Sequence, residues 1–323
     1  MERLSMRLNT LVATLMVMMA APAFADGKAV SESKKVSANE RIELEVMRGD
    51  VDITVTSKEQ FSIKGTLDEE AEGYEFTSSG GVTRFEVKMP RRLYNNGYSE
   101  DKRGSRLTVE VPQGARLSFE GVSTSVKAKG VQGGADITTV NGSIDASELA
   151  GKVSLQTVNG NIESRNIQGH LKLATVNGEI KDQSAGASLE MESVNGELQS
   201  VSSAKDVEVS TVNGEVNLAL TGSERVEFST VNGQIDISLK GSKAPRISGS
   251  SVSGALVLTL PDLDSARISV EASAGGDIEN KLTNDKVEEA KYGPMRNLDT
   301  TLGDGDGRIE LETVSGEVVL KRN

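Results

Sequence analysis

The sequence predicts an all-β protein whose central part is a single-stack β-helix, or β-solenoid, with coils of about 18 residues. First, Val-Asn-Gly recurs six times at a nearly constant interval, as stacked structural repeats do. Second, apolar residues alternate with polar ones before each copy, which indicates an extended strand. Third, a polar residue follows each Gly and an apolar residue comes one position later, which favours a coil over a hairpin.

Residues 1–25 are predicted to be a secretory signal peptide. Arg3 and Arg7 precede an apolar run at 11–20, and Ala23-Phe24-Ala25 has the small-x-small pattern of a cleavage site. The apolar run is too short to cross a bilayer core of about 30 Å comfortably, and no second such stretch follows. We therefore expect cleavage after Ala25, a periplasmic or secreted protein, and no transmembrane segment after cleavage.

Residues 26–115 are predicted to form an N-terminal β region without the repeat. Apolar residues alternate with charged ones over 42–46 and again over 51–55, on either side of a turn. Further alternating segments lie at 85–89 and 107–111. The intervening stretch 91–105 is rich in Gly, Asn and charged residues, so it is predicted to be an exposed loop.

Residues 116–260 are predicted to be the solenoid. Degenerate copies of the repeat at 122–124 and 252–254 flank the regular ones, as terminal coils of a stack do. The aliphatic residues, the repeat valine among them, are expected to stack inside, and the Ser or Thr before each valine would form a row of hydroxyls. The predicted structural corner consists of Asn141, Gly142, Asn159, Gly160, Asn177, Gly178, Asn195, Gly196, Asn213, Gly214, Asn232 and Gly233.

An antiparallel array of hairpins is the alternative, because Asn-Gly between strands is a strong hairpin signal. In a two-residue hairpin the residues on either side of Asn-Gly face each other on the same side of the sheet. Val176 would then face Glu179, and Val194 would face Glu197. This repeated mismatch favours the coil, in which Gly lets the corner adopt positive φ and neighbouring Asn side chains bond each other.

Residues 261–323 are predicted to be a C-terminal β region. A degenerate repeat lies at 274–278, and residues 280–307 form a long polar segment that is predicted to be a loop. The segment 308–321 returns to the strand, corner and strand pattern, so we expect a final coil that docks on the stack.

These motifs together resemble the bacterial "putative adhesin" family, which comprises cell-envelope β-strand-repeat domains of unknown function. The resemblance rests on strands ending at 109–114, on the ladder of Ser/Thr-Val-Asn/Ser-Gly boxes, on 258–261 and on the closing box at 313–318. It extends from about Ile42 to the C-terminus. It implies a β-helix-like fold and an extracytoplasmic role, and it brings no catalytic residues with it.

Charge and composition narrow the classes of function. The formal net charge is −12, and signal cleavage would make it −13 by removing Glu2, Arg3 and Arg7, so binding to nucleic acid by charge is disfavoured. The chain has no Cys, and its only His is His170, so it contains no thiolate site and no multi-His site. We predict no catalytic residues and no cofactor-binding residues.

Two rows of carboxylates are the candidate binding surface, one after the corner glycines and one before the corners. Their members are Glu179, Glu197 and Glu215, and Glu190, Glu208 and Glu227. Two carboxylates about 4.8 Å apart in water repel each other by only about 1 kcal/mol, so a solvated acidic face is tolerable. The sharper hypothesis is a strip that recruits divalent cations. Asp304 and Asp306 are weak candidates for a calcium site, because their Gly-rich loop lacks the later bidentate Glu.

The function predicted from the sequence is that of a non-enzymatic, exported envelope protein that binds or scaffolds through a rigid solenoid surface. Its expected partner is an envelope protein or glycan. A polysaccharide lyase or hydrolase is the alternative, because β-helices host such enzymes. That alternative requires two converging carboxylates, or a base with a metal, and no such pair stands out in the sequence.

Overall fold

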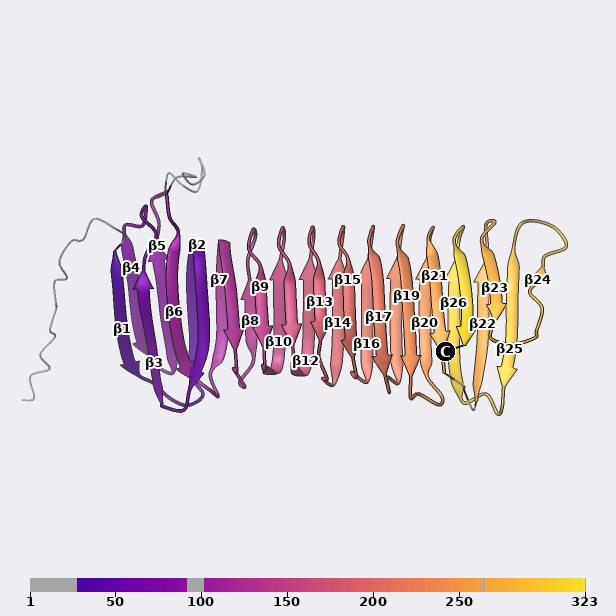
Figure 1. Cartoon of the computed structure of the whole chain (residues 1–323), viewed down its shortest axis with the longest axis horizontal. Coiled ribbons are helices and arrows are strands. Elements are labelled where there is room, and N and C mark those ends of the chain that lie inside the picture. The colour runs from indigo at the N-terminus through magenta and orange to yellow at the C-terminus, as the bar shows by residue number, and fades with distance from the viewer. Residues whose placement is uncertain (1–27, 92–101, 262, 264, 323) are drawn as a thin grey trace, which may run out of the picture.

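The computed structural model describes residues 28–91, 102–261, 263 and 265–322. The predicted signal peptide and most of the predicted loop 91–105 lie outside these residues. In the described part, 27 strands join into one hydrogen-bonded sheet that wraps into a rod, and the strands lie across the long axis (Figure 1). No helix in this part has the length and hydropathy of a membrane span.

The N-terminal end of the rod is built around the long strand β2, which pairs in parallel with β5, β6 and β7. Strands β1, β3 and β4 add antiparallel pairs to this end. Three large aromatic side chains, Phe61, Phe85 and Phe119, are fully buried here. The strands are β1 (Ala29–Lys35), β2 (Arg41–Thr56), β3 (Gln60–Thr66), β4 (Gly73–Ser79), β5 (Val82–Lys88), β6 (Ser105–Pro112) and β7 (Arg116–Lys129).

In the middle of the rod each coil gives one strand to each of two faces. Equivalent strands of successive coils pair in parallel, with Leu171 opposite Leu189 on one face and Ile180 opposite Leu198 on the other. This confirms the solenoid and shows that the hairpin array is wrong. The first face holds β8 (Ala135–Thr138), β10 (Ala150–Thr157), β12 (Gln168–Thr175), β14 (Ser188–Ser193), β16 (Asp206–Thr211), β18 (Arg225–Thr230) and β20 (Arg246–Ser251). The second holds β9 (Ile144–Ser147), β11 (Ile162–Arg165), β13 (Ile180–Gln183), β15 (Leu198–Ser202), β17 (Glu215–Thr221), β19 (Gln234–Lys240) and β21 (Ala255–Leu260).

The interior is a set of apolar ladders, because each inward side chain lies on the equivalent one of the next coil. Leu155, Leu173, Met191, Val209 and Phe228 form one such ladder, and all are buried. Stacking of like on like fills the narrow interior with aliphatic groups. This explains how a long chain folds with only 3% aromatic residues.

At the corner the valine points outward, contrary to the prediction, and the hydroxyl residue before it points inward. Thr175 is buried, whereas Val194 and Val212 are each 38% exposed. Side chains alternate between the two faces of a strand, so Thr175 points inward with Leu171 and Leu173. The following residue, Val176, must then point outward. Some of the buried hydroxyls donate to the previous coil, as in the bond from Thr157 Oγ1 to the carbonyl oxygen of Gly142 at 2.9 Å. The hydroxyl oxygens of Ser193, Thr211 and Thr230 are buried without a hydrogen-bond partner among the described residues.

The corner glycines do not have positive φ, contrary to the expectation. They are needed for close approach instead. A Cβ on Gly178 would lie 1.9 Å from the carbonyl oxygen of Gly160, and the other corner glycines have the same contact with the preceding coil. The Asn side chains form the expected ladder, in which Nδ2 of Asn177 donates to Oδ1 of Asn159 at 2.9 Å and Nδ2 of Asn195 to Oδ1 of Asn177 at 3.0 Å.

The last coil is inserted into the stack rather than added to its end. Strand β26 pairs in parallel with both β20 and β22, and β27 pairs with both β21 and β23. The prediction of a loop over 280–307 is wrong at 280–281, 288–289 and 296–302, which belong to β23, β24 and β25. Strand β25 pairs antiparallel with β22 and completes the end of the rod. The strands are β22 (Ala266–Ala272), β23 (Asp277–Lys281), β24 (Glu288–Glu289), β25 (Arg296–Leu302), β26 (Gly307–Thr313) and β27 (Glu317–Arg322).

Candidate functional site

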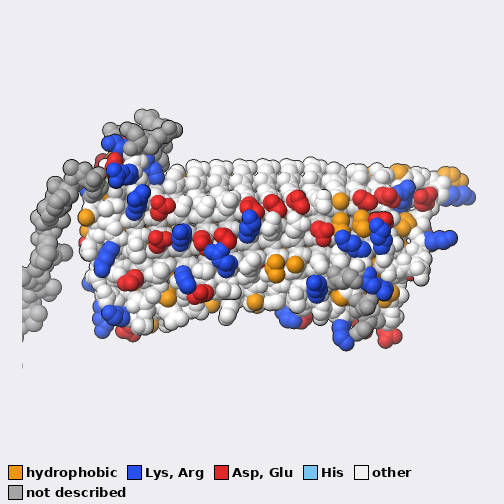
Figure 2. Space-filling model, in the orientation of Figure 1, with side chains coloured by type: hydrophobic (Ala, Val, Ile, Leu, Met, Phe, Trp, Pro, Cys, Tyr) orange, Lys and Arg blue, Asp and Glu red, His pale blue; other side chains and the backbone are white. Residues whose placement is uncertain are grey.

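Outward side chains form charged rows that run along the rod, because stacking places equivalent positions of successive coils side by side. Figure 2 shows acidic and basic side chains lying in such lines over one face, below an upper edge that carries no charge. On the first face the predicted row is in register, with Glu190 opposite Glu208 and Glu208 opposite Glu227. On the second face Glu179, Glu197 and Glu215 occupy the position before β13, the position before β15 and the start of β17.

Most of these carboxylates already have a partner within the rod. Lys181 Nζ lies 2.6 Å from Oε1 of Glu179, and the amide groups of Gln199 and Asn217 donate to Glu197 and Glu215. The second-face row is therefore largely satisfied by its own neighbours.

On the first face Lys172 bridges two carboxylates. Its Nζ donates to Glu190 at 2.6 Å and to Glu192 at 3.0 Å, and the bond from Lys172 holds the pKa of Glu190 below its ordinary value. Glu208 and Glu227 have no ion pair among the described residues. These two exposed carboxylates are the part of the predicted rows that remains open to a ligand.

Metal-binding geometry is not found in the part of the chain that the structure describes. No group of three or more His, Asp or Glu side chains there could hold a metal ion. Asp304 and Asp306 lie in the exposed turn before β26, and the backbone N–H of Asp306 donates to Oγ of Ser265 at 2.8 Å. The turn thus leads the chain into the inserted coil.

A buried carboxylate that the sequence analysis missed lies beneath the second face. Asp182 points into the interior and is only 2% exposed. It accepts hydrogen bonds from Ser164 at 2.7 Å, from Ser184 at 2.9 Å and from Ser200 at 2.9 Å. Burial raises the pKa of Asp182 while these bonds oppose the rise, because hydroxyl donors favour the charged form. The alternation Ile180, Asp182, Ser184 was the signal that could have revealed it.

Above Asp182 the second face has a hollow of about 570 Å³. Its lining includes the charged side chains Glu163, Arg165 and Lys181, together with Val201, which is 61% exposed. Arg165 is held by Asp145 at 2.8 Å and also pairs with Glu163. The hollow is thus mixed in charge, and its lining also includes the apolar side chains of Leu218 and Ala219.

A row of four arginines runs along the first face near the C-terminal end of the rod. Arg225 lies opposite Arg246, Arg246 opposite Arg308, and Arg308 opposite Arg267. All four side chains are exposed. We call this set the arginine row. The order of the arginines in space differs from their order in the sequence, because the inserted strand β26 places Arg308 between Arg246 and Arg267.

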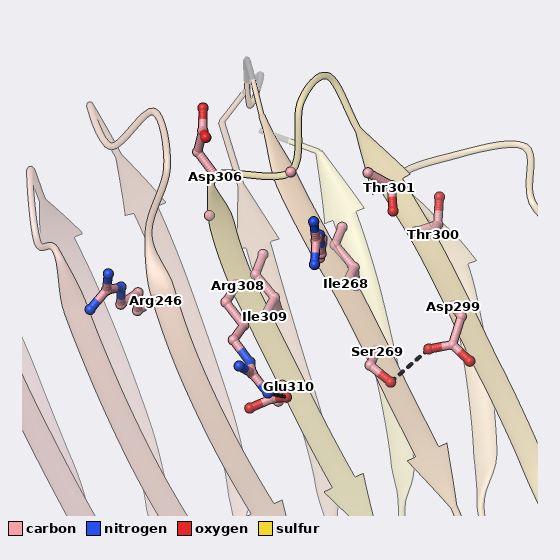
Figure 3. A pocket seen from close by; sticks show the side chains of 13 residues that line it. Arg246, Ile268, Ser269, Asp299, Thr300, Thr301, Asp306, Arg308, Ile309 and Glu310 are labelled. Carbon is pink, nitrogen blue, oxygen red and sulfur yellow. Dashed lines mark hydrogen bonds and ion pairs between the residues drawn. The ribbon is translucent and has the colours of Figure 1, made fainter.

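The arginine row borders a hollow of about 860 Å³ formed over β20, β26, β22 and β25. Figure 3 shows Arg246 and Arg308 on neighbouring strands and the bond from Ser269 to Asp299 on the far side of the hollow, at 2.7 Å. Nη2 of Arg308 donates to Glu310 at 2.5 Å. Among the described residues Arg246 and Arg267 have no side-chain partner, so two guanidinium groups remain available at this hollow.

The same position on the other coils of the first face is mostly basic or uncharged. Towards the N-terminal end the row continues through Asp206, Ser188, His170 and Lys152. His170 is exposed, and its Nδ1 lies 2.8 Å from Oγ of Ser188. His170, the only histidine of the chain, is thus one member of a surface row.

A likeness to known proteins is found across nearly the whole chain. The family model described as Toastrack DUF4097 matches residues 39–321. Among solved structures, a "putative adhesin" from Bacteroides fragilis shares 16% identity over 72% of this chain and 97% of its own, with a TM-score of 0.44. A "putative lipid binding protein" from Parabacteroides distasonis shares 12% identity over 91% and 97%, with a TM-score of 0.45. No curated protein matches.

Proposed function

The chain belongs to the Toastrack DUF4097 family, and we propose that it is an exported, non-enzymatic module that binds an envelope component along the outer rows of its rod. The observation that carries this proposal is periodicity. Several outward positions repeat one residue type from coil to coil, as the corner Asn ladder and the row of Glu190, Glu208 and Glu227 do, so a ligand with its own repeat can contact several coils at once. An enzyme site instead needs a singular cluster of groups.

Rigidity supports the same role. The rod is held by parallel ladders on both faces and by an interior of stacked aliphatic side chains, so little order has to be gained when a ligand binds. A preformed surface of this kind suits a binding or scaffolding protein.

Export is tested by cell fractionation and by sequencing the N-terminus of the mature protein. We expect the protein in the periplasm or the medium, with Asp26 as its first residue. Recovery of an uncleaved chain from the cytoplasm would contradict the proposed location.

Binding is tested by crosslinking the protein in intact cells and identifying what it captures. We expect an envelope protein or glycan. The decisive opposite result is release of oligosaccharides when the purified protein is incubated with envelope glycans, because that would support a lyase or hydrolase instead.

A further inference from the structure

The arginine row has the chemistry of a site for a chain of carboxylates. A guanidinium group binds a carboxylate through two parallel N–H bonds and stays charged at every physiological pH. The row presents four such groups in register on β18, β20, β26 and β22. Two members are engaged, Arg225 with Asp206 at 3.6 Å and Arg308 with Glu310 at 2.5 Å. Arg246 and Arg267 have no partner in the described chain and lie beside the hollow of about 860 Å³.

The distance between the arginines indicates which kind of polymer fits the row. Neighbouring strands lie about 4.8 Å apart, so Arg246 and Arg267, which have one strand between them, are separated along the rod by about 9.6 Å. One ring of a 1,4-linked sugar chain advances by nearly one strand spacing. A twofold-twisted chain of uronic acids therefore presents carboxylates on one side at the spacing of Arg246 and Arg267.

An extended acidic peptide fits the row less well. Its side chains on one face recur every two residues, about 6.6 Å, which matches neither one strand spacing nor two. A peptide lying along the rod would also run across the strands, so it could not add to the sheet through backbone hydrogen bonds.

The surroundings of the row favour a thin ligand over a broad anionic surface. A second row runs beside the arginine row, two residues further along the same strands, and it includes Glu227 and Glu310. Asp299 on β25 pairs in register with Ser269 and extends this second row. A membrane surface or a nucleic-acid duplex would bring its own negative charges over these carboxylates, and the whole chain carries a net charge of −12. A single polymer chain following the row avoids them.

We propose that the arginine row binds a linear acidic polysaccharide, with Arg246 and Arg267 each pairing with a uronate carboxylate two sugars apart. This proposal rests on the proposed function as an envelope-binding module, and it names the chemical class of the ligand. If the arginine row binds no polysaccharide, another face of the rod can still bind an envelope component. The two proposals can therefore fail separately.

The test is a titration of the purified mature protein with oligogalacturonates, which are 1,4-linked uronates, followed by calorimetry at low and high salt. We expect binding that weakens as salt rises, because the contact is ionic. The variant R246Q/R267Q should lose about tenfold in affinity, since each of the two solvent-exposed ion pairs contributes up to about fivefold in the equilibrium constant. Its melting temperature should match the wild type, because both side chains are exposed.

The matched control is R165Q/K181Q, which removes the same charge from the second face. It should bind oligogalacturonate as the wild type does. An equal loss of affinity in both double variants would overturn the proposal, because it would show that binding depends on net charge alone. Binding of poly-glutamate but not oligogalacturonate, lost in R246Q/R267Q, would replace the polysaccharide with an acidic peptide. Absence of binding to either polymer would overturn the site, while capture of an envelope component in intact cells would still support the proposed function.

Discussion

At the scale of single residues, the corner glycines decide whether the coils can stack. Gly178 lies against the carbonyl oxygen of Gly160, and the same contact recurs from coil to coil. Any side chain at this position would push neighbouring coils apart. The repeat therefore keeps Gly for lack of space, with a backbone conformation that other residues could adopt.

We predict that Gly178→Ala destabilises the rod strongly. The added Cβ would lie 1.9 Å from backbone, which cannot move without separating two coils, so the loss should reach the upper end of the roughly 0.5–3 kcal/mol seen for point substitutions. Denaturant unfolding measures it. The control is Gly73→Ala, where a Cβ meets nothing within 4 Å and the change should stay within about 0.5 kcal/mol. Equal stability of the two variants would show that the corner is not close-packed.

Asp182 is the residue whose contribution to stability should depend on pH. Its folded pKa is raised above the ordinary value of 3.8 by burial. The folded state thus holds the proton more tightly than the unfolded state does. The contribution of Asp182 is therefore complete below the unfolded pKa and is lost as the pH rises through the folded pKa.

We predict that the change in the free energy of unfolding caused by Asp182→Asn is more favourable at pH 7 than at pH 4. The amide is neutral at both values and can still accept hydrogen bonds from the surrounding serines, whereas the ionised carboxylate carries a desolvation cost at pH 7. Urea unfolding at the two pH values measures the difference. Asp136→Asn, at an exposed position of β8, should have the same small effect at both. A larger loss for Asp182→Asn at pH 7 would mean that the three hydroxyl bonds outweigh burial.

At the scale of elements, the inserted coil determines how the C-terminal end is held. Strands β26 and β27 form parallel ladders on both sides, and within the described residues β22 and β23 are joined to the stack through these two strands. Removing the last coil therefore separates β22–β25 from the rest of the rod.

We predict that a chain ending at Gly307 is less well folded than a shorter chain ending at Leu260. The longer chain lacks β26 and β27, so the edges of β20 and β21 and the facing edges of β22 and β23 are all left unpaired. The shorter chain leaves only the edges of β20 and β21 unpaired. Limited proteolysis should cut residues 261–307 of the longer chain quickly, and size-exclusion chromatography should show more aggregation. Protection of 261–307 would indicate instead that β22 pairs directly with β20.

At the scale of the whole molecule, the charged rows exist only because coils stack. Glu179, Glu197 and Glu215 come from three different coils, and each has a cationic or amide partner two residues further along the chain. The rod thus spreads its negative charge in lines and balances much of it locally.

We predict that calcium gives this row no special stability. Calcium needs six or more oxygens, and the described residues hold no group of three acidic side chains arranged for a metal. The wild type and the variant E197Q/E215Q should show the same change in melting temperature when calcium is added. A calcium-dependent rise seen only in the wild type would establish the acidic row as a cation strip.

The sequence by itself determined the coil. The period of 18 residues, the strand alternation and the polar residue after each Gly are local features, and they were enough to predict parallel stacking and the Asn ladder. They also located the acidic rows, because a fixed period gives every outward position its neighbours. The inward phase of the corner hydroxyls is equally local, since Thr175 follows Leu171 and Leu173 in steps of two. The apolar character of the neighbouring valine nevertheless predicts that the valine lies inside.

Only the tertiary structure decided the contacts that depend on the order of coils and on the space between them. Strand β26 pairs with β20 across about sixty intervening residues, and nothing local in either strand specifies that partner. The arginine row follows from that choice, because Arg308 enters between Arg246 and Arg267 only when the last coil is inserted. The close approach of the glycines likewise depends on the neighbouring coil. Pairing over such distances is selected by the fit of whole strands, so it became visible only in the folded rod.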